Sequence, residues 1–303
     1  MYRAIRFPEN PIIHSGLDEQ IGTNINGPSV IRVPDWVSHP LGRYYLYFAH
    51  HQGTFIRMAY ANTLNGPWKI HGGGVLQLAD TCCRDHIASP DVHVCTEDQS
   101  FRMYFHGVTD DGQRSFLATS PDGVHFHALP EVLGPFYFRT FQHSAAWFAI
   151  AKTTDAPGGG LLLRSPDGIL PFEQGPDIFP NQRHVAVLKR GNDLHIFFSR
   201  GEDRPERILF ATMSLTGDWK AWQPSEPKEI LRPETEEEGA HLPVFPSRFG
   251  AVHEPVHELR DPAIYEEDGR LYLFYAGAGE SNICVAELVR EGIWAISAFN
   301  ELP

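Results

Sequence analysis

The stretch Gly42–His50, GRYYLYFAH, is followed after a short turn by Phe55–Ala61, FIRMAYA, and then by the closing turn Gly66-Pro67-Trp68. Each of the first two segments is long enough for one strand, and both are rich in the aromatic residues that strands prefer. Two such segments separated by a short turn predict an antiparallel hairpin. This unit, and its recurrence along the chain, predicts the fold.

The same unit occurs four more times, and an aromatic residue closes each of the first four units. These aromatic residues lie roughly 50 residues apart, a spacing typical of a four-stranded propeller blade. We therefore predict an all-β protein, a five-bladed β-propeller forming a single domain over residues 1–303, with the N-terminal segment helping to close the ring against the last blade. The closing aromatics are Trp68, Phe126, Phe172 and Trp219. The further units are Ser100–His106 with Ser115–Ser120, Ala145–Ile150 with Gly160–Ser165, Asp193–Phe198 with Arg207–Thr212, and Gly269–Tyr275 with Asn282–Glu287.

The bulk composition narrows the class of partner. The formal net charge is -13, from 25 basic and 38 acidic residues, and such a surface repels nucleic acid and anionic lipid. The segment Met1–Pro11 contains no apolar run of the kind found in signal peptides, so we expect a cytoplasmic protein. Its 4 cysteines show no Cys-x-x-Cys spacing and are expected to be reduced thiols. The sequence does not indicate an oligomeric state.

A small polar cluster precedes the first hairpin strand of each unit. In a propeller the first strand of each blade lines the central channel, so these clusters should meet at one end of the axis. The sequence therefore predicts a polar axial pocket. The clusters are Asn26–Ser29, Ala88–Asp91, Phe141–Ser144, Gln182–Val185 and Leu259–Pro262.

Four short motifs carry a family resemblance. The Ser-Pro-Asp-Gly and Gly-Pro-Trp turns, with Ser89-Pro90-Asp91 and Arg260-Asp261-Pro262, resemble the five-bladed propeller glycoside hydrolases. These are the arabinanase and β-xylosidase family and relatives such as the neoagarobiose hydrolases and mannoside phosphorylases. The resemblance covers nearly the whole chain as architecture. It implies a glycosidase that acts on a terminal sugar of an oligosaccharide or glycoside in the axial pocket.

The catalytic residues of that family are matched only in part. Family enzymes carry an Asp base at the start of blade one, a second Asp in blade two, a Glu acid in blade three and a His in blade four. Asp91 matches the second-blade Asp and His184 fits the fourth-blade His, but Gly27 stands at the base position and His143 where the Glu would be. Glycoside hydrolysis needs an acid and a base or nucleophile. The resemblance thus implies Asp91 or Asp261 as base and His143 or His184 as acid.

Further residues near the predicted pocket are candidates for substrate binding. Arg183 and Arg260 would suit a substrate carboxylate or sulfate, or they could pair with Asp91 or Asp261. Glu254 and Glu258 are weaker candidates for the acid. The full set of predicted substrate-binding residues is Asn26, His50, His86, His106, Arg183 and Arg260.

Several histidines, His50, His51 and His106 among them, fall at strand ends, but no His-x-His or His-Glu-x-x-His spacing supports a metal site, and no cofactor is expected.

Three classes of function stay open, and the first is the glycosidase described above. The departure at Gly27 allows a carbohydrate-binding propeller without catalysis. A propeller enzyme of another chemistry, an isomerase, lyase or cyclase using histidine, is the third possibility.

Overall fold

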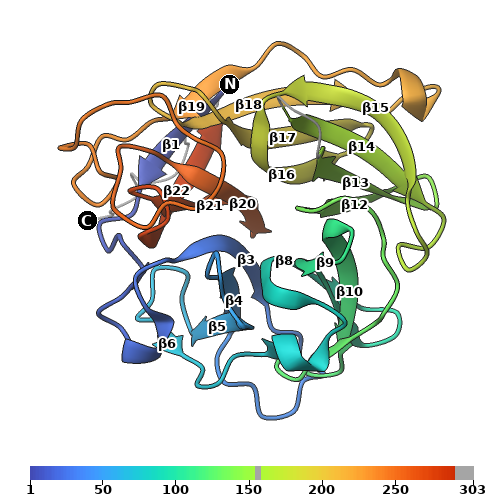
Figure 1. The fold of residues 1–303 in the computed structure, drawn as a ribbon, viewed down its shortest axis with the longest axis horizontal. Coiled ribbons are helices and arrows are strands. Elements are labelled where there is room, and N and C mark those ends of the chain that lie inside the picture. The colour runs from blue at the N-terminus through green and yellow to red at the C-terminus, as the bar shows by residue number, and fades with distance from the viewer. Residues whose placement is uncertain (154–157, 291–303) are drawn as a thin grey trace, which may run out of the picture.

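The computed structural model describes residues 1–153 and 158–290. Five antiparallel sheets stand in a ring around a central axis (Figure 1), which confirms the predicted all-β five-bladed propeller. The last residues of the predicted domain, 291–303, lie outside the described residues. In the described part the helices are short 3-10 turns, and none is long and apolar enough to cross a membrane. They are Glu19–Ile21, Leu78–Asp80 and Trp219–Ala221.

The strands of the first four blades follow one another in chain order from the axis outward. Blade one contains β3 (Asn26–Arg32), β4 (Tyr44–Ala49), β5 (Phe55–Ala61) and β6 (Lys69–Ile70), with β7 (Leu76–Gln77) also paired to β5. Blade two contains β8 (Arg84–Cys95), β9 (Ser100–Thr109), β10 (Gly112–Ser120) and β11 (His127–Ala128). Blade three contains β12 (Arg139–His143), β13 (Ala146–Lys152), β14 (Gly159–Ser165) and β15 (Glu173–Pro180). Blade four contains β16 (Gln182–Arg190), β17 (Asp193–Arg200), β18 (Ile208–Ser214) and β19 (Lys228–Leu231).

Blade five is assembled from both ends of the chain. It contains β20 (Arg260–Glu267), β21 (Arg270–Gly277) and β22 (Asn282–Arg290). The outer strand is β1 (Tyr2–Arg6), which pairs antiparallel with β22, and β2 (Ile13–His14) pairs with the same strand. Hydrogen bonds between the first and last strands close the ring (Figure 1), as the sequence predicted.

The hydrophobic core lies between neighbouring blades. The predicted closing aromatics Trp68, Phe126 and Phe172 are buried there. In blade four, Trp222 is buried and Trp219 is only partly buried, because Trp219 begins a 3-10 turn that carries the chain outward. Aromatic wedges of this kind hold adjacent sheets together by apolar burial.

Four of the five inner strands contain a β-bulge at the pocket end. The register slips between Asn26 and Ser29 in β3, and equivalent slips occur in β8, β16 and β20. Positive φ angles occur within three of these bulges, at Gly27 (61°), Ser89 (53°) and Asp261 (48°). A Cβ on Gly27 would lie 3.4 Å from the Cα of Ser89, so the bulged backbones approach closely around the axis. The bulges re-aim side chains at the pocket, as bulges near active sites commonly do.

Blade three departs from the prediction. The cluster Phe141–Ser144 was expected to begin the inner strand, but β12 ends at His143, which pairs with Ala146 across a tight hairpin. Ser144 and Ala145 both have positive φ, the geometry of a two-residue hairpin turn that Asn-Gly usually forms. The sequence contains no such signal here. The residue of blade three that reaches the axis is instead Tyr137, which precedes β12 and also has a positive φ (63°).

Candidate functional site

All five blades contribute to a pocket at the starts of the inner strands. It encloses about 240 Å3, including space open to solvent. Its lining is polar and rich in histidine, so it is suited to hydrogen bonding and to proton transfer. The lining residues are Asn26, His51, Ala88, Ser89, His106, Tyr137, His184, Asp261 and Glu280.

His184 and Asp261 form a buried carboxylate–imidazole pair on one wall of this pocket. Nδ1 of His184 contacts Oδ1 of Asp261, and the backbone N–H of Gly27 donates to Oδ2 at 3.2 Å. Burial acts to raise the pKa of Asp261, but the contact with His184 outweighs it and the pKa is lowered. Burial lowers the pKa of His184 despite the carboxylate. The pair therefore consists of an ionised carboxylate and a neutral imidazole at neutral pH, with Nε2 left for proton transfer.

Glu280 and His51 form a second carboxylate–imidazole pair. Oε2 of Glu280 lies 3.3 Å from Nδ1 of His51 and accepts a hydrogen bond from Nδ2 of Asn24 at 2.8 Å. Arg260 donates to Oε1 at 2.9 Å. Burial would raise the pKa of Glu280, but the bond to His51 and the charge of Arg260 hold it well below its ordinary value. Glu280 is thus an ionised carboxylate that fixes the His51 ring.

An aromatic stack lines the wall between these pairs. The Tyr137 ring lies edge-on between His106 and His184, with centroids 4.6 Å from each. His106 is only 2% exposed, and burial lowers its pKa well below the ordinary value, so its ring is neutral. Within the described residues, Nδ1 of His106 is buried without a hydrogen-bond partner. Buried polar atoms are normally satisfied, so we expect this nitrogen to bond a water or a ligand group in the pocket that His106 lines.

Arg183 and Arg260 do not line the pocket, which corrects one prediction. Arg183 pairs with Glu206 at 3.0 Å, and Arg260 pairs with Glu258 at 2.5 Å. Both guanidinium groups also donate to the carbonyls of Arg248 and Gly250 in the long connection between blades four and five. A buried guanidinium needs partners for its charge and its N–H groups, and these carboxylates and carbonyls supply them. The two arginines therefore hold this connection beside the pocket. Neither pairs with Asp91, and their carboxylate partners are glutamates.

Two predicted binding histidines lie outside the pocket lining. His86 is half-buried, with its ring 5.7 Å from that of His106 and 6.3 Å from that of His51. It lies next to the lining histidines but does not line the pocket itself. Nδ1 of His50 accepts a hydrogen bond from the backbone of Gln52 at 3.0 Å, within its own turn. Asn26 and His106 do line the pocket, as predicted.

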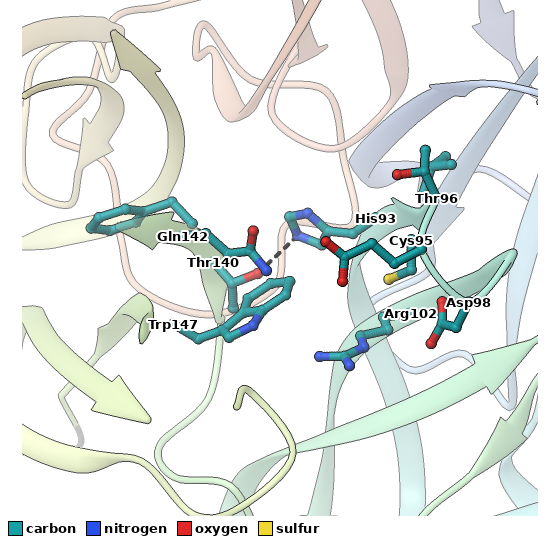
Figure 2. A pocket seen from close by; sticks show the side chains of 11 residues that line it. His93, Cys95, Thr96, Asp98, Arg102, Thr140, Gln142 and Trp147 are labelled. Atoms are coloured by element: carbon teal, nitrogen blue, oxygen red, sulfur yellow. Dashed lines mark hydrogen bonds between the residues drawn. The ribbon is translucent and has the colours of Figure 1, made fainter. Parts of the chain in front are cut away.

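Asp91 and His143 lie apart from the axial pocket. The Asp91 carboxylate accepts hydrogen bonds from Nε2 of His93 and the backbone N–H of Thr140, both at 2.9 Å. His93 and Thr140 line a second pocket of about 370 Å3 between blades two and three (Figure 2). The His143 ring lies 5.5 Å from that of Trp222. Of the four residues expected to share the axial pocket, the structure brings together His184 and Asp261 only.

Glu280 and Tyr137 line the pocket but were not predicted from the sequence. In a hairpin the second strand runs antiparallel to the first, so its end lies beside the start of the first strand. Glu280 follows the second strand of blade five, just as His51 follows that of blade one. That topological rule would have found Glu280, whereas a tyrosine with positive φ has no sequence signal.

The described residues contain no group of three or more His, Cys, Asp or Glu side chains placed to hold a metal ion. The histidines of the pocket are instead distributed among carboxylates and aromatic rings. The side chains of this site can form hydrogen bonds and transfer protons.

The pKa shift of Glu280 predicts an acid-sensitive fold. A carboxylate with a depressed folded pKa contributes stability that is present above its ordinary pKa, 4.5 for Glu280, and lost as the pH falls below it. We expect Glu280→Gln to lower the free energy of unfolding by about 1–3 kcal/mol at pH 7, because it removes a charged hydrogen-bond acceptor of Arg260. The difference from the parent protein should narrow at pH 3. Urea unfolding at both pH values measures this, and the exposed Glu226→Gln is the control. A difference that stays constant with pH would contradict the prediction.

No protein-family model matches the chain, but one curated protein is similar to it over nearly its whole length. The chain is 36% identical over 328 residues to the uncharacterized protein R118 of Acanthamoeba polyphaga mimivirus, covering 94% of this chain and 90% of that protein.

Solved structures with similar folds include glycoside hydrolases. One comes from work on the GH130 family of mannoside phosphorylases, which reports hydrolases that target β-1,2 mannosidic linkages in Candida mannan (TM-score 0.68, 12% identity, 94% of this chain and 93% of that chain). A thermostable family-43 glycoside hydrolase gives 0.65 at 13% identity, with 89% and 91% covered. The GH43_1 enzyme of Xanthomonas citri complexed with xylotriose gives 0.61 at 14%, with 89% of each chain covered. These similarities confirm, as a fold, the resemblance inferred from the sequence.

Proposed function

The chain belongs to the family of the mimivirus protein R118. Because it has a polar axial pocket on a fold that glycoside hydrolases share, we propose that it is a glycoside hydrolase-like enzyme acting on a terminal sugar of an oligosaccharide. The observation that carries the proposal is the presence of two carboxylate–imidazole pairs in one axial pocket. His184 is held by Asp261, and His51 is held by Glu280. Paired titratable groups in different environments are the arrangement that acid–base catalysis requires.

In this proposal the His184–Asp261 pair is the base. The neutral imidazole accepts a proton from the attacking water at Nε2, while Asp261 orients the ring and stabilises the imidazolium that forms. His184, oriented by Asp261, takes over the part of the family base, because the blade-one position is Gly27, which contributes only a backbone N–H to the Asp261 carboxylate.

The proton for the leaving oxygen comes from the opposite pair. His51, held at Nδ1 by Glu280, is the candidate acid, and its side chain is 24% exposed, which leaves the ring accessible from the pocket mouth. Burial raises the pKa of Tyr137, so its hydroxyl stays protonated and can donate a hydrogen bond to the sugar. Hydrolysis then uses two imidazoles in place of the two carboxyl groups of ordinary glycosidases.

The pocket is small. Its free space is about 10 Å3, room for about one water molecule, so a single terminal unit that enters with movement of the lining side chains suits it better than an internal segment. The unpartnered Nδ1 of His106 would bond a hydroxyl of that unit.

A panel of aryl glycosides and of plant and marine oligosaccharides tests the proposal. Each compound is measured in parallel for binding by calorimetry and for product release. We expect at least one compound to bind and to be cleaved at its terminal sugar. If no compound that binds gives a product, the enzymatic proposal is wrong.

A second candidate function is carbohydrate binding without catalysis. The observation that favours it is Gly27, which replaces a side-chain base with a backbone N–H. In that case sugars would bind in the same pocket, with an affinity that depends on His106 and not on proton transfer.

Replacing His106 tests the pocket itself under either function. His106→Phe keeps the ring but removes Nδ1, so we expect the affinity for the terminal sugar to fall about tenfold, the loss for one hydrogen bond at a buried site. The exposed His125→Phe is the matched control, since that ring is paired with Asp122 at the surface. Unchanged affinity in the His106 variant would mean that the sugar does not bind in the axial pocket.

A further inference from the structure

Lys152 lies in blade three next to Tyr137, the residue of that blade that lines the axial pocket. It ends β13, the second strand of its blade, and its backbone N–H donates to the carbonyl of Phe136 at 3.0 Å. The end of the second strand of a blade lies beside the start of its first strand. Lys152 is the last residue of the second strand in blade three, and His51 and Glu280 come shortly after the second strands of blades one and five.

The ammonium group of Lys152 is surrounded by aromatic rings. Nζ lies 4.3 Å from the ring centroid of Phe249, 5.6 Å from that of Phe136 and 5.8 Å from that of Tyr137. Tyr137 is itself a lining residue of the axial pocket. Within residues 1–153 and 158–290, no carboxylate oxygen lies within 4.0 Å of this nitrogen. The cation is thus held beside the pocket by ring faces and not by an ion pair.

Lys152 has no ion-pair partner among residues 1–153 and 158–290. Arg183 also lies over the Phe249 ring, with its guanidinium carbon 5.3 Å from the ring centroid, and its charge is paired with Glu206. Burial and the positive charge of Arg183 lower the pKa of Lys152 to about 8. An anion bound next to Nζ would offset both effects.

We propose that Lys152 binds an anionic group of the sugar substrate, a carboxylate, sulfate or phosphate, so that the substrate is an acidic oligosaccharide. The inference rests on the proposed function and names its substrate class. The terminal sugar occupies the axial pocket, and the anionic group lies between Lys152 and the Phe249 ring, which offers an apolar face to the same sugar unit or to its neighbour. Phe249 is 37% exposed and so is accessible to a ligand.

Matched ligands test the inference by calorimetry. Oligosaccharides ending in a uronic acid, their carboxyl-reduced neutral counterparts, and sulfated and phosphorylated versions are titrated into the full-length protein. We expect one anionic class to bind about tenfold more tightly than its neutral counterpart, the gain for one charge-assisted hydrogen bond, and the class that does so identifies the anion.

Variants assign that preference to Lys152. Lys152→Met should remove the tenfold preference and leave the affinity for the neutral ligand unchanged, while Lys152→Arg should retain it. Lys189→Met is the control, because it removes one exposed positive charge near the far end of β16, away from the pocket. If Lys152 had only a structural role, the Met variant would lower the melting temperature without changing the preference.

The pH dependence gives a second readout. Lys152 loses its charge as the pH rises through about 8, so the preference for the anionic ligand should weaken between pH 7 and pH 9. The neutral counterpart, measured in the same buffers, corrects for the other ionisable groups near Lys152, which are Arg183, Glu206, Arg260 and Tyr137.

The two failures are distinguishable. If neutral oligosaccharides bind and are cleaved as well as their anionic counterparts, the inference about Lys152 is overturned and the proposed function stands. If no oligosaccharide of either class binds, the proposed function is overturned, and the inference with it.

Discussion

Asp261→Asn is expected to lower turnover of a cleaved substrate by about 10²–10⁴-fold, the usual share of general acid–base participation. The carboxylate contacts Nδ1 of His184 and so leaves Nε2 as the proton acceptor. An amide at this position can present its NH2 group to the ring instead, which favours the tautomer with the proton on Nε2, and that tautomer cannot act as a base. The measurement is kcat/KM on the best substrate of the panel, with the melting temperature recorded alongside.

Asp91→Asn is the matched control, because the sequence motif points to Asp91 and the geometry points to Asp261. The Asp91 carboxylate bonds His93 and Thr140 outside the axial pocket, so we expect its replacement to lower the free energy of unfolding by about 1–3 kcal/mol and to change kcat/KM only a few-fold. Loss of turnover in the Asp91 variant together with near-normal turnover in the Asp261 variant would show that the motif, and not the pocket, marks the base.

The fold was predictable because its signals are local. The segment Phe55–Ala61 read from the sequence has the same bounds as β5, and Gly42–His50 contains the whole of β4. Hairpins are specified by apolar runs and by glycine and proline turns, all within about ten residues of one another. Repetition then fixes the architecture, because each blade can bury its faces only against the next one.

The pocket residues were predictable only in part, because the β-bulges decide which residues of the inner strands face the axis. Within a bulge the residue before proline reaches the pocket, as Ser89 and Asp261 do, whereas Asp91, the residue after Pro90, turns toward blade three. In a regular strand Ser89 and Asp91 would point the same way, and the register slip between Ala88 and Asp91 is what separates them. A motif that contains Ser-Pro-Asp does not by itself say which residue faces the axis.

The pairing of the buried arginines with distant glutamates could not be predicted from the sequence. Arg183 pairs with Glu206 and Arg260 pairs with Glu280, each across a connection between strands. Which carboxylate meets which guanidinium depends on how the connection between blades four and five crosses the pocket end of the propeller, and that path leaves no periodic pattern in the sequence.

The strongest effect on stability is expected from Arg260→Met. The Arg260 side chain is 1% exposed, and its guanidinium group donates to Glu258 at 2.5 Å and to Glu280 at 2.9 Å, with Glu206 at 3.6 Å. Methionine fills a similar volume but leaves these buried carboxylates without their shared cation. Breaking a buried ion pair from one side costs about 3–5 kcal/mol, so the free energy of unfolding measured in urea should fall by that amount.

Arg270→Met is the matched control for that experiment. Its guanidinium also pairs with a glutamate, Glu287, at 2.5 Å, but the arginine side chain is 56% exposed. Water screens an exposed pair, so the loss should be at most about 1 kcal/mol. Equal losses in the two variants would mean that burial does not set the value of the Arg260 cluster. If the expected difference is found, Glu280 depends on Arg260 for its charge, and Arg260→Met should also weaken sugar binding in the axial pocket, because the ring of His51 would no longer be fixed.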